Sequence, residues 1–151
     1  MLKPYVCVAC EKAIIAKDNV ASLISLFSKI ILNPPAGTEI PKNAVSPTQW
    51  CVFSIWDTEP GDEDRKYVLC TQVLYPDGTQ FAEVIRHDMV IEPAKRSQML
   101  VQFFGFPIGQ TGDYTVLTWI EESGHRVLGP IDFKLGVEVV YQEHAPSKAA
   151  T

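Results

Sequence analysis

Two cysteines near the start of the chain form the motif CVAC, at residues 7–10. A C-x-x-C pair can supply half of a zinc site or form a redox disulfide. Zinc would need two more ligands with matching spacing, and Cys51 and Cys70 are single. On a strand, positions three apart point to opposite faces, so Cys7 and Cys10 cannot share a metal ion there. We therefore expect buried core or interface cysteines, with no cofactor bound.

Acidic side chains gather in a second segment, DTEPGDEDRK, at residues 57–66. Carboxylate-rich loops can bind calcium, which takes about six to eight oxygen ligands. This segment lacks EF-hand spacing, and a second loop would have to contribute carboxylates. We expect a solvated turn, and we keep calcium-dependent binding as an alternative. The ligands of such a site would be Asp57, Glu59, Asp62, Asp64 and Asp113.

Histidine and its neighbours give little indication of catalysis. Arg86, His87 and Asp88 are consecutive, but adjacent residues on a strand point opposite ways, so His87 and Asp88 do not form a dyad. No G-x-S-x-G nucleophile motif accompanies them. A site assembled from distant residues such as His87, His125 or Cys10 is the least favoured alternative. We predict no catalytic residues.

Composition and charge exclude several classes of protein. The chain has 151 residues and a net charge of −5, with 46% hydrophobic and 21% charged residues, as in one ordinary folded domain. It has no electrostatic reason to bind nucleic acid or an anionic membrane. The apolar run at residues 5–10 is too short for a secretory signal or a membrane span. We predict a cytoplasmic location and reduced cysteines.

The elements that must position these residues are predicted to be strands. Alternation of apolar and polar residues is clearest in GPIDFKLGVEVVYQ, residues 129–142, a strand that would close a sheet or pair across a dimer edge. Asp77-Gly78 and Ser123-Gly124 indicate hairpin turns. These signals predict an all-β fold, an antiparallel sandwich or barrel.

The stretch NVASLISLFSKIIL, residues 19–32, fits two periods. Its apolar residues recur with helical spacing, but they also alternate. Its β-branched content and its strand neighbours favour a strand over a helix. A smaller hint comes from Tyr114, which follows a turn at the start of a predicted strand. In Greek-key sandwiches such a tyrosine folds its hydroxyl back onto the backbone, although an ordinary buried tyrosine would fit as well.

Several segments carry a resemblance to a known family: VACEKAIIAKDNVASLISLFSKI, YPDGT, FPIGQTGDYTVLTWIEESG and GPIDFKLGV. Together they resemble a bacterial family of small uncharacterised proteins of immunoglobulin-like fold. The resemblance implies an immunoglobulin-like sandwich of about seven to nine strands. We expect one domain over residues 3–141 and a flexible tail over 142–151. The resemblance brings no site residues with it.

Both faces of QWCVFSIWD, residues 49–57, are apolar. A sandwich strand normally exposes one face to solvent, so we expect the second face to be covered by the Pro-rich segment 33–49 or by another subunit. The leading hypothesis is a non-enzymatic binding or assembly module that acts through a sheet face, an edge or the end loops. Its partner would be another protein or a second copy of the chain. The predicted interface residues are Trp50, Val52 and Trp56.

Overall fold

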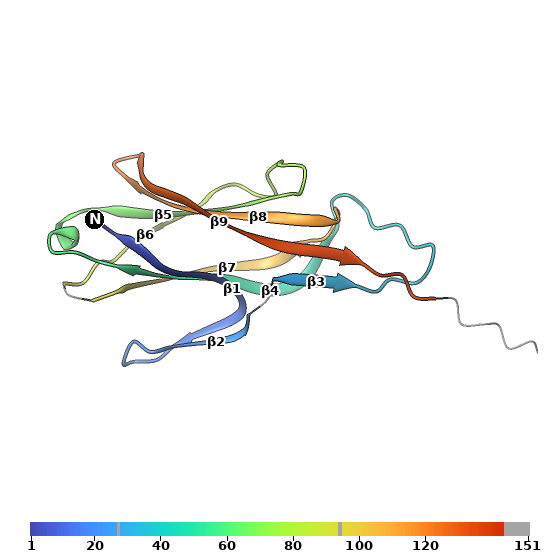
Figure 1. Cartoon of the computed structure of the whole chain (residues 1–151), viewed down its shortest axis with the longest axis horizontal. Helices are drawn as coiled ribbons and strands as arrows, with labels where there is room; N and C mark the ends of the chain where they lie inside the picture. The colour runs from blue at the N-terminus through green and yellow to red at the C-terminus, as the bar shows by residue number, and fades with distance from the viewer. Residues whose placement is uncertain (27, 94, 144–151) are drawn as a thin grey trace, which may run out of the picture.

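The computed structural model describes residues 1–26, 28–93 and 95–143. These residues form strands in two stacked sheets, with one short 3-10 helix, η1 (Asp62–Asp64), and no α-helix (Figure 1). The predicted all-β class is confirmed. The strands are β1 (Lys3–Ile15), β2 (Ala21–Leu26), β3 (Lys29–Leu32), β4 (Val45–Asp57), β5 (Tyr67–Leu74), β6 (Ile85–Asp88), β7 (Ser97–Pro107), β8 (Gly112–Glu122) and β9 (His125–Val139).

The two sheets have four and five strands. The first, sheet A, has the order β2-β1-β4-β7, and the second, sheet B, has the order β3-β9-β8-β5-β6. Among the described strands, every pairing is antiparallel except that of β3 with β9, which is parallel. The expectation of a purely antiparallel fold is therefore wrong at this one edge. The last strand lies between β3 and β8, so it is not a free dimer edge.

Residues 19–32 form two strands, which confirms the strand interpretation of this stretch; Phe27 lies outside the described residues. β2 belongs to sheet A, whereas β3 belongs to sheet B. A single segment of sequence therefore connects the two layers of the sandwich. Both turn predictions are also confirmed: Gly78 and the pair Ser123-Gly124 adopt positive φ in tight turns.

A hairpin formed by the second half of β1 and by β2 makes an additional layer. Up to Cys10, β1 pairs with β4, and from Cys10 onward it pairs with β2. Figure 1 shows this hairpin bending away beneath the rest of sheet A. Ala13 and Leu23 from the hairpin pack against a small cluster that contains Cys51 and Phe53 on the outer face of β4.

The main core lies between the sheets. Large side chains from both layers meet there, and Trp50 of β4 stacks on Phe103 of β7 with ring centroids 4.3 Å apart. Phe106 and Tyr114 extend the aromatic contacts toward one end of the sandwich. Both sheets contribute to this one core. Within the described part of the chain, no helix has the length and hydropathy of a membrane span.

The connection between β3 and β4 runs along one end of the sandwich. The N–H of Ile108 donates to the carbonyl of Ala44, and the N–H of Gln142 donates to the carbonyl of Pro34. Gly109 approaches the Lys42 carbonyl so closely that a Cβ at this position would lie 1.9 Å from the oxygen. These contacts hold the Pro-rich segment at the end of the molecule. Most of the predicted tail, residues 144–151, lies outside the described residues.

Candidate functional site

The three predicted interface residues, Trp50, Val52 and Trp56, lie in the main core. Their side chains are 1%, 1% and 0% exposed. The Trp50 indole N–H donates to the carbonyl of Gly105 at 2.9 Å, and the Trp56 indole N–H donates to the Ser54 hydroxyl at 2.9 Å. Side chains buried in this way cannot contact a partner while the domain stays folded, so the structure contradicts their assignment to an interface.

The opposite face of β4 is also covered, and this explains why both of its faces are apolar. Cys51 and Phe53 are 3% and 1% exposed beneath the β1–β2 hairpin. Neither the Pro-rich segment nor a second subunit is needed to cover this face. The sequence prediction chose the wrong alternatives because the covering hairpin comes from residues about 30 positions earlier in the chain.

The acidic loop after β4 is held by contacts within the chain. Asp57 forms an ion pair with Arg96, and Glu59 forms one with Lys3. The buried carboxylate of Asp62 accepts hydrogen bonds from the Tyr67 hydroxyl at 2.8 Å and from the backbone N–H of Glu59 at 2.9 Å. Three of the predicted calcium ligands therefore have protein partners.

The pKa values at this loop show the same stabilisation of charge. Burial acts to raise the pKa of Asp62, but the hydrogen bonds from Glu59 and Tyr67 outweigh it, so the pKa is lowered overall. For Tyr67, burial and the neighbouring Asp62 carboxylate raise the pKa to about 12. The pair is therefore a carboxylate and a neutral phenol at neutral pH, joined by one charge-assisted hydrogen bond.

Asp113 does not join the acidic loop. It pairs with Gly136 at the start of β8, whereas the acidic loop leads into Tyr67, which pairs with Glu122 at the end of β8. Nine residues along a strand correspond to about 30 Å. Among residues 1–26, 28–93 and 95–143, no group of three or more His, Cys, Asp or Glu side chains could hold a metal ion. The predicted calcium ligands are thus not brought together.

The two cysteines of CVAC face opposite sides of sheet A, as predicted. Cys7 points into the main core, where its thiol lies 4.0 Å from the Thr118 hydroxyl. Cys10 belongs to the small cluster beneath the hairpin. Its sulfur is 3.2 Å from that of Cys51, the residue directly opposite it on β4. Sequence patterns did not predict this contact, because the two positions are 41 residues apart.

The histidines are surface residues. His87 lies on the exposed edge strand β6, and His125 starts β9 at the tip of a hairpin; both are exposed. The Arg86 Nε lies 3.7 Å from a carboxylate oxygen of Glu121. Cys10, the third residue of the scattered-site alternative, is buried. The fold does not assemble these residues into one site.

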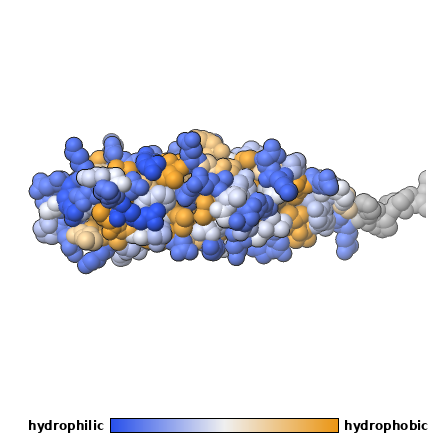
Figure 2. All heavy atoms as spheres, turned by 90° about the horizontal axis from the view of Figure 1, so that it is seen from above, coloured by the Kyte–Doolittle hydropathy of each residue, from blue (hydrophilic) through white to orange (hydrophobic). Residues whose placement is uncertain are grey.

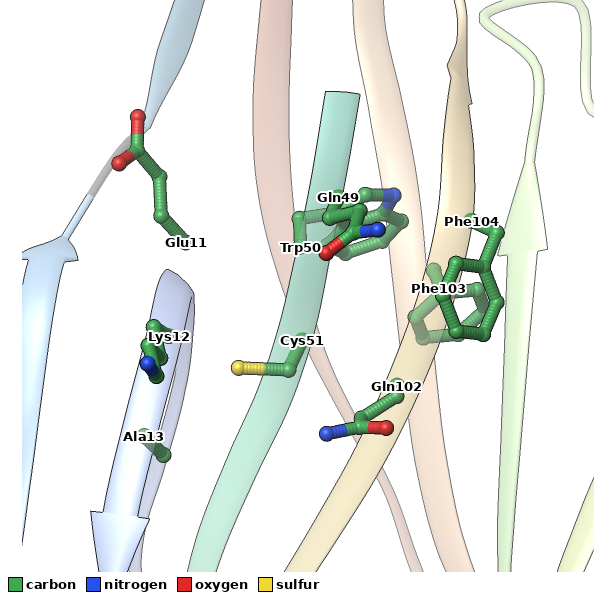
Figure 3. A pocket seen from close by; sticks show the side chains of 9 residues that line it. All are labelled: Glu11, Lys12, Ala13, Gln49, Trp50, Cys51, Gln102, Phe103 and Phe104. Atoms are coloured by element: carbon green, nitrogen blue, oxygen red, sulfur yellow. The ribbon is translucent and has the colours of Figure 1, made fainter. Parts of the chain in front are cut away.

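A groove opens on the outer face of sheet A, beside the hairpin (Figure 3). Its volume is about 200 Å³. Residues 11–13 form one wall, and Gln49, Cys51, Gln102 and Phe104 lie across from them. Small-molecule sites typically enclose roughly 300–1,000 Å³. The groove is therefore suited to a single side chain or a very small molecule.

The groove adjoins the edge strand β7. This strand has eleven residues and contains no charged side chain. Within the described part of the chain it pairs on one side only, with β4. Phe104 on β7 is 78% exposed. Unpaired backbone groups on a long uncharged edge strand are a template for pairing with another strand. Sequence alternation could place β7 in a sheet but could not show that it forms an edge.

No family model and no curated protein matches this chain. The resemblance to a bacterial immunoglobulin-like family and the cytoplasmic location accordingly stay predictions.

Proposed function

We propose that this protein is a non-enzymatic assembly module of immunoglobulin-like topology, in which the β7 edge pairs with the β7 edge of a second copy. The observation that carries the proposal is that β7 is a long, uncharged strand at the end of sheet A, with no strand of the described residues paired beyond it. A protein partner that adds its own strand at the same edge is the alternative occupant.

The strand order supports the immunoglobulin-like assignment. In that fold, strands A, B, E and D form one sheet, and C, F and G form the other, with C′ beside C in variable-type domains. Here β1, β4 and β7 correspond to A, B and E, while β5, β6, β8 and β9 correspond to C, C′, F and G. In the described part of the chain, no strand takes the position of D. This is the position beside β7.

A second copy suits this edge because a two-fold axis places each residue opposite residues of the same strand. Like charges directly opposite each other destabilise a sheet, and β7 carries none. The other edges are less suitable. β6 carries Arg86, His87 and Asp88, β3 begins with Lys29, and β2 is six residues long with Ser25 at φ 54°.

The outer face of sheet B offers no comparable surface. Figure 2 views the molecule from this side and shows hydrophilic and hydrophobic residues intermixed. Asp132 and Lys134 lie on β9, and Lys134 donates a hydrogen bond to the Thr115 hydroxyl on the neighbouring strand. Association through the sheet A edge would leave this face in solvent.

The test is the solution mass of the protein, measured by light scattering during size exclusion. We expect a dimer for the natural protein and a monomer for Phe104→Lys, because the variant places two lysines at the paired edge. Tyr141→Lys is the matched control: it also replaces an exposed aromatic ring with lysine, but away from this edge, and it should stay dimeric. A weak dimer of this kind would have a dissociation constant of about 100 µM or below. A natural protein that stays monomeric at about that concentration would overturn self-association.

A further inference from the structure

We propose that Cys10 and Cys51 are a site of reversible disulfide formation, oxidised by small hydroperoxides that enter through the groove on sheet A. The inference concerns the thiol pair alone and holds whether or not β7 mediates assembly.

The register of the sheet places the two cysteines at disulfide distance. Cys10 and Cys51 are directly opposite each other in the antiparallel pair β1–β4. Opposed residues in such a pair have Cα atoms about 4.5 or 5.5 Å apart, and both values lie within the range of disulfides, about 4.4–6.8 Å. The sulfurs are already 3.2 Å apart. A disulfide can therefore form without a change of strand register.

In the reduced state the same contact is a weak hydrogen bond between two thiols. The Cys51 thiol also lies 3.4 Å from the carbonyl of Cys10. Burial and the neighbouring Cys10 raise the pKa of Cys51 to about 12. Because the thiolate is the reactive form, oxidation of the folded protein should be slow at neutral pH and faster as pH rises.

A small molecule in the groove would reach the cysteine pair from the side of Cys51. Cys10 is fully buried, whereas Cys51 forms part of the groove lining. Figure 3 shows its sulfur directed toward the strand segment that carries Lys12 and Ala13. The groove volume of about 200 Å³ admits hydrogen peroxide. We therefore assign the first attack to Cys51 and the second step to Cys10.

The chemistry balances in two steps. The Cys51 thiol first loses its proton, and the thiolate attacks one oxygen of hydrogen peroxide. The O–O bond breaks, Cys51 becomes a sulfenic acid, and the departing hydroxide takes up the released proton to form water. The Cys10 sulfur then attacks the Cys51 sulfur, an S–S bond forms and the S–O bond breaks, and the departing hydroxide leaves as a second water with the Cys10 thiol proton. The two cysteines lose two protons and two electrons, and the peroxide is reduced to two waters. A thiol such as dithiothreitol reverses the change.

The other two cysteines provide matched controls. Cys7 faces the main core beside Thr118, and Cys70 lies on β5 opposite Trp119 in sheet B. The disulfide would join residues 41 positions apart, at the point where β1 passes from β4 to β2. Restricting the unfolded chain in this way should raise the Tm by roughly 10 °C.

The test is peptide mapping after hydrogen peroxide treatment of the reduced, folded protein at pH 8 and at a more alkaline pH. Free thiols are blocked before digestion with trypsin under non-reducing conditions. Cys7 and Cys10 share the tryptic peptide 1–12, and Cys51 lies in peptide 43–65. We expect these two peptides to be linked, and we expect dithiothreitol to separate them.

The variants assign the link to one cysteine of peptide 1–12. Cys7→Ser and Cys70→Ser should keep the link, whereas Cys10→Ser should lose it. A link that persists in Cys10→Ser, or one that is lost in Cys7→Ser while circular dichroism shows a folded domain, would overturn the assignment. So would an unlinked natural protein whose Cys51 has been oxidised to sulfinic acid. If only the unfolded protein forms the link, the proposal also fails.

Discussion

The Tyr114 hydroxyl donates a 2.8 Å hydrogen bond to the carbonyl of Gln110 and accepts one of 3.1 Å from the N–H of the same residue. The side chain is fully buried, at the start of β8. The tyrosine thus satisfies both backbone groups of a residue four positions upstream and fixes the turn that leads into the strand. This is the geometry expected of a tyrosine corner.

Removing this hydroxyl should destabilise the fold. Tyr114→Phe keeps the ring among Tyr75 and Phe106 but leaves the N–H and carbonyl of Gln110 without this partner. We expect a loss of about 1–2 kcal/mol in the free energy of unfolding, measured by urea denaturation. Tyr141→Phe changes an exposed tyrosine and serves as the control. Equal stability of the two variants would contradict a structural role for the hydroxyl.

Truncation of Trp56 should affect folding. The side chain is 0% exposed and packs in the main core, so Trp56→Ala removes a large buried ring. We expect a loss of about 3–5 kcal/mol, a large fraction of the roughly 5–15 kcal/mol typical of a domain. The readout is the midpoint of denaturant unfolding. A variant with unchanged stability but altered association would restore Trp56 to an interface.

Stability should fall in acid partly because of Asp62. Its pKa is lowered in the folded protein, so its contribution is present above the pKa of the unfolded chain and is lost as pH falls through the folded value. We compare the Tm of the natural protein and of Asp62→Asn between neutral pH and about pH 3.

The natural protein should be the more stable at neutral pH, and its advantage should shrink toward the acid limit. Tyr67 does not confuse this comparison, because its pKa of about 12 keeps the phenol protonated throughout. A constant difference in Tm across this range would show that the charge of Asp62 contributes nothing.

Local patterns predicted the strands and turns well. The alternation in β9 and the turns at Gly78 and Gly124 depend on neighbours within a few residues, and the structure contains all three. The tyrosine corner was one of two interpretations of Tyr114 that the sequence allowed, and it depends on a residue only four positions upstream. Such features are encoded by φ preferences and by side-chain period, which a single sequence displays.

The faces of β4 could not be assigned in this way. Trp50 and Cys51 are both buried, one against sheet B and one beneath the β1–β2 hairpin. Alternation separates two faces but does not say which layer covers each. The contact between Cys10 and Cys51 was hidden for the same reason, since it depends on which strands are neighbours and in what register.

The parallel pair β3–β9 has a consequence for the order of folding. Lys29 pairs with Gly136, a residue synthesised more than 100 positions later. The β1–β2 hairpin can close locally as soon as it has been made, whereas β3 has no sheet to join until β9 exists. Contacts between distant residues form slowly because a long loop must first close. We expect docking of β3 onto β9 to be among the last events of folding. A chain that ends before β9 would leave β3 without a partner strand in sheet B.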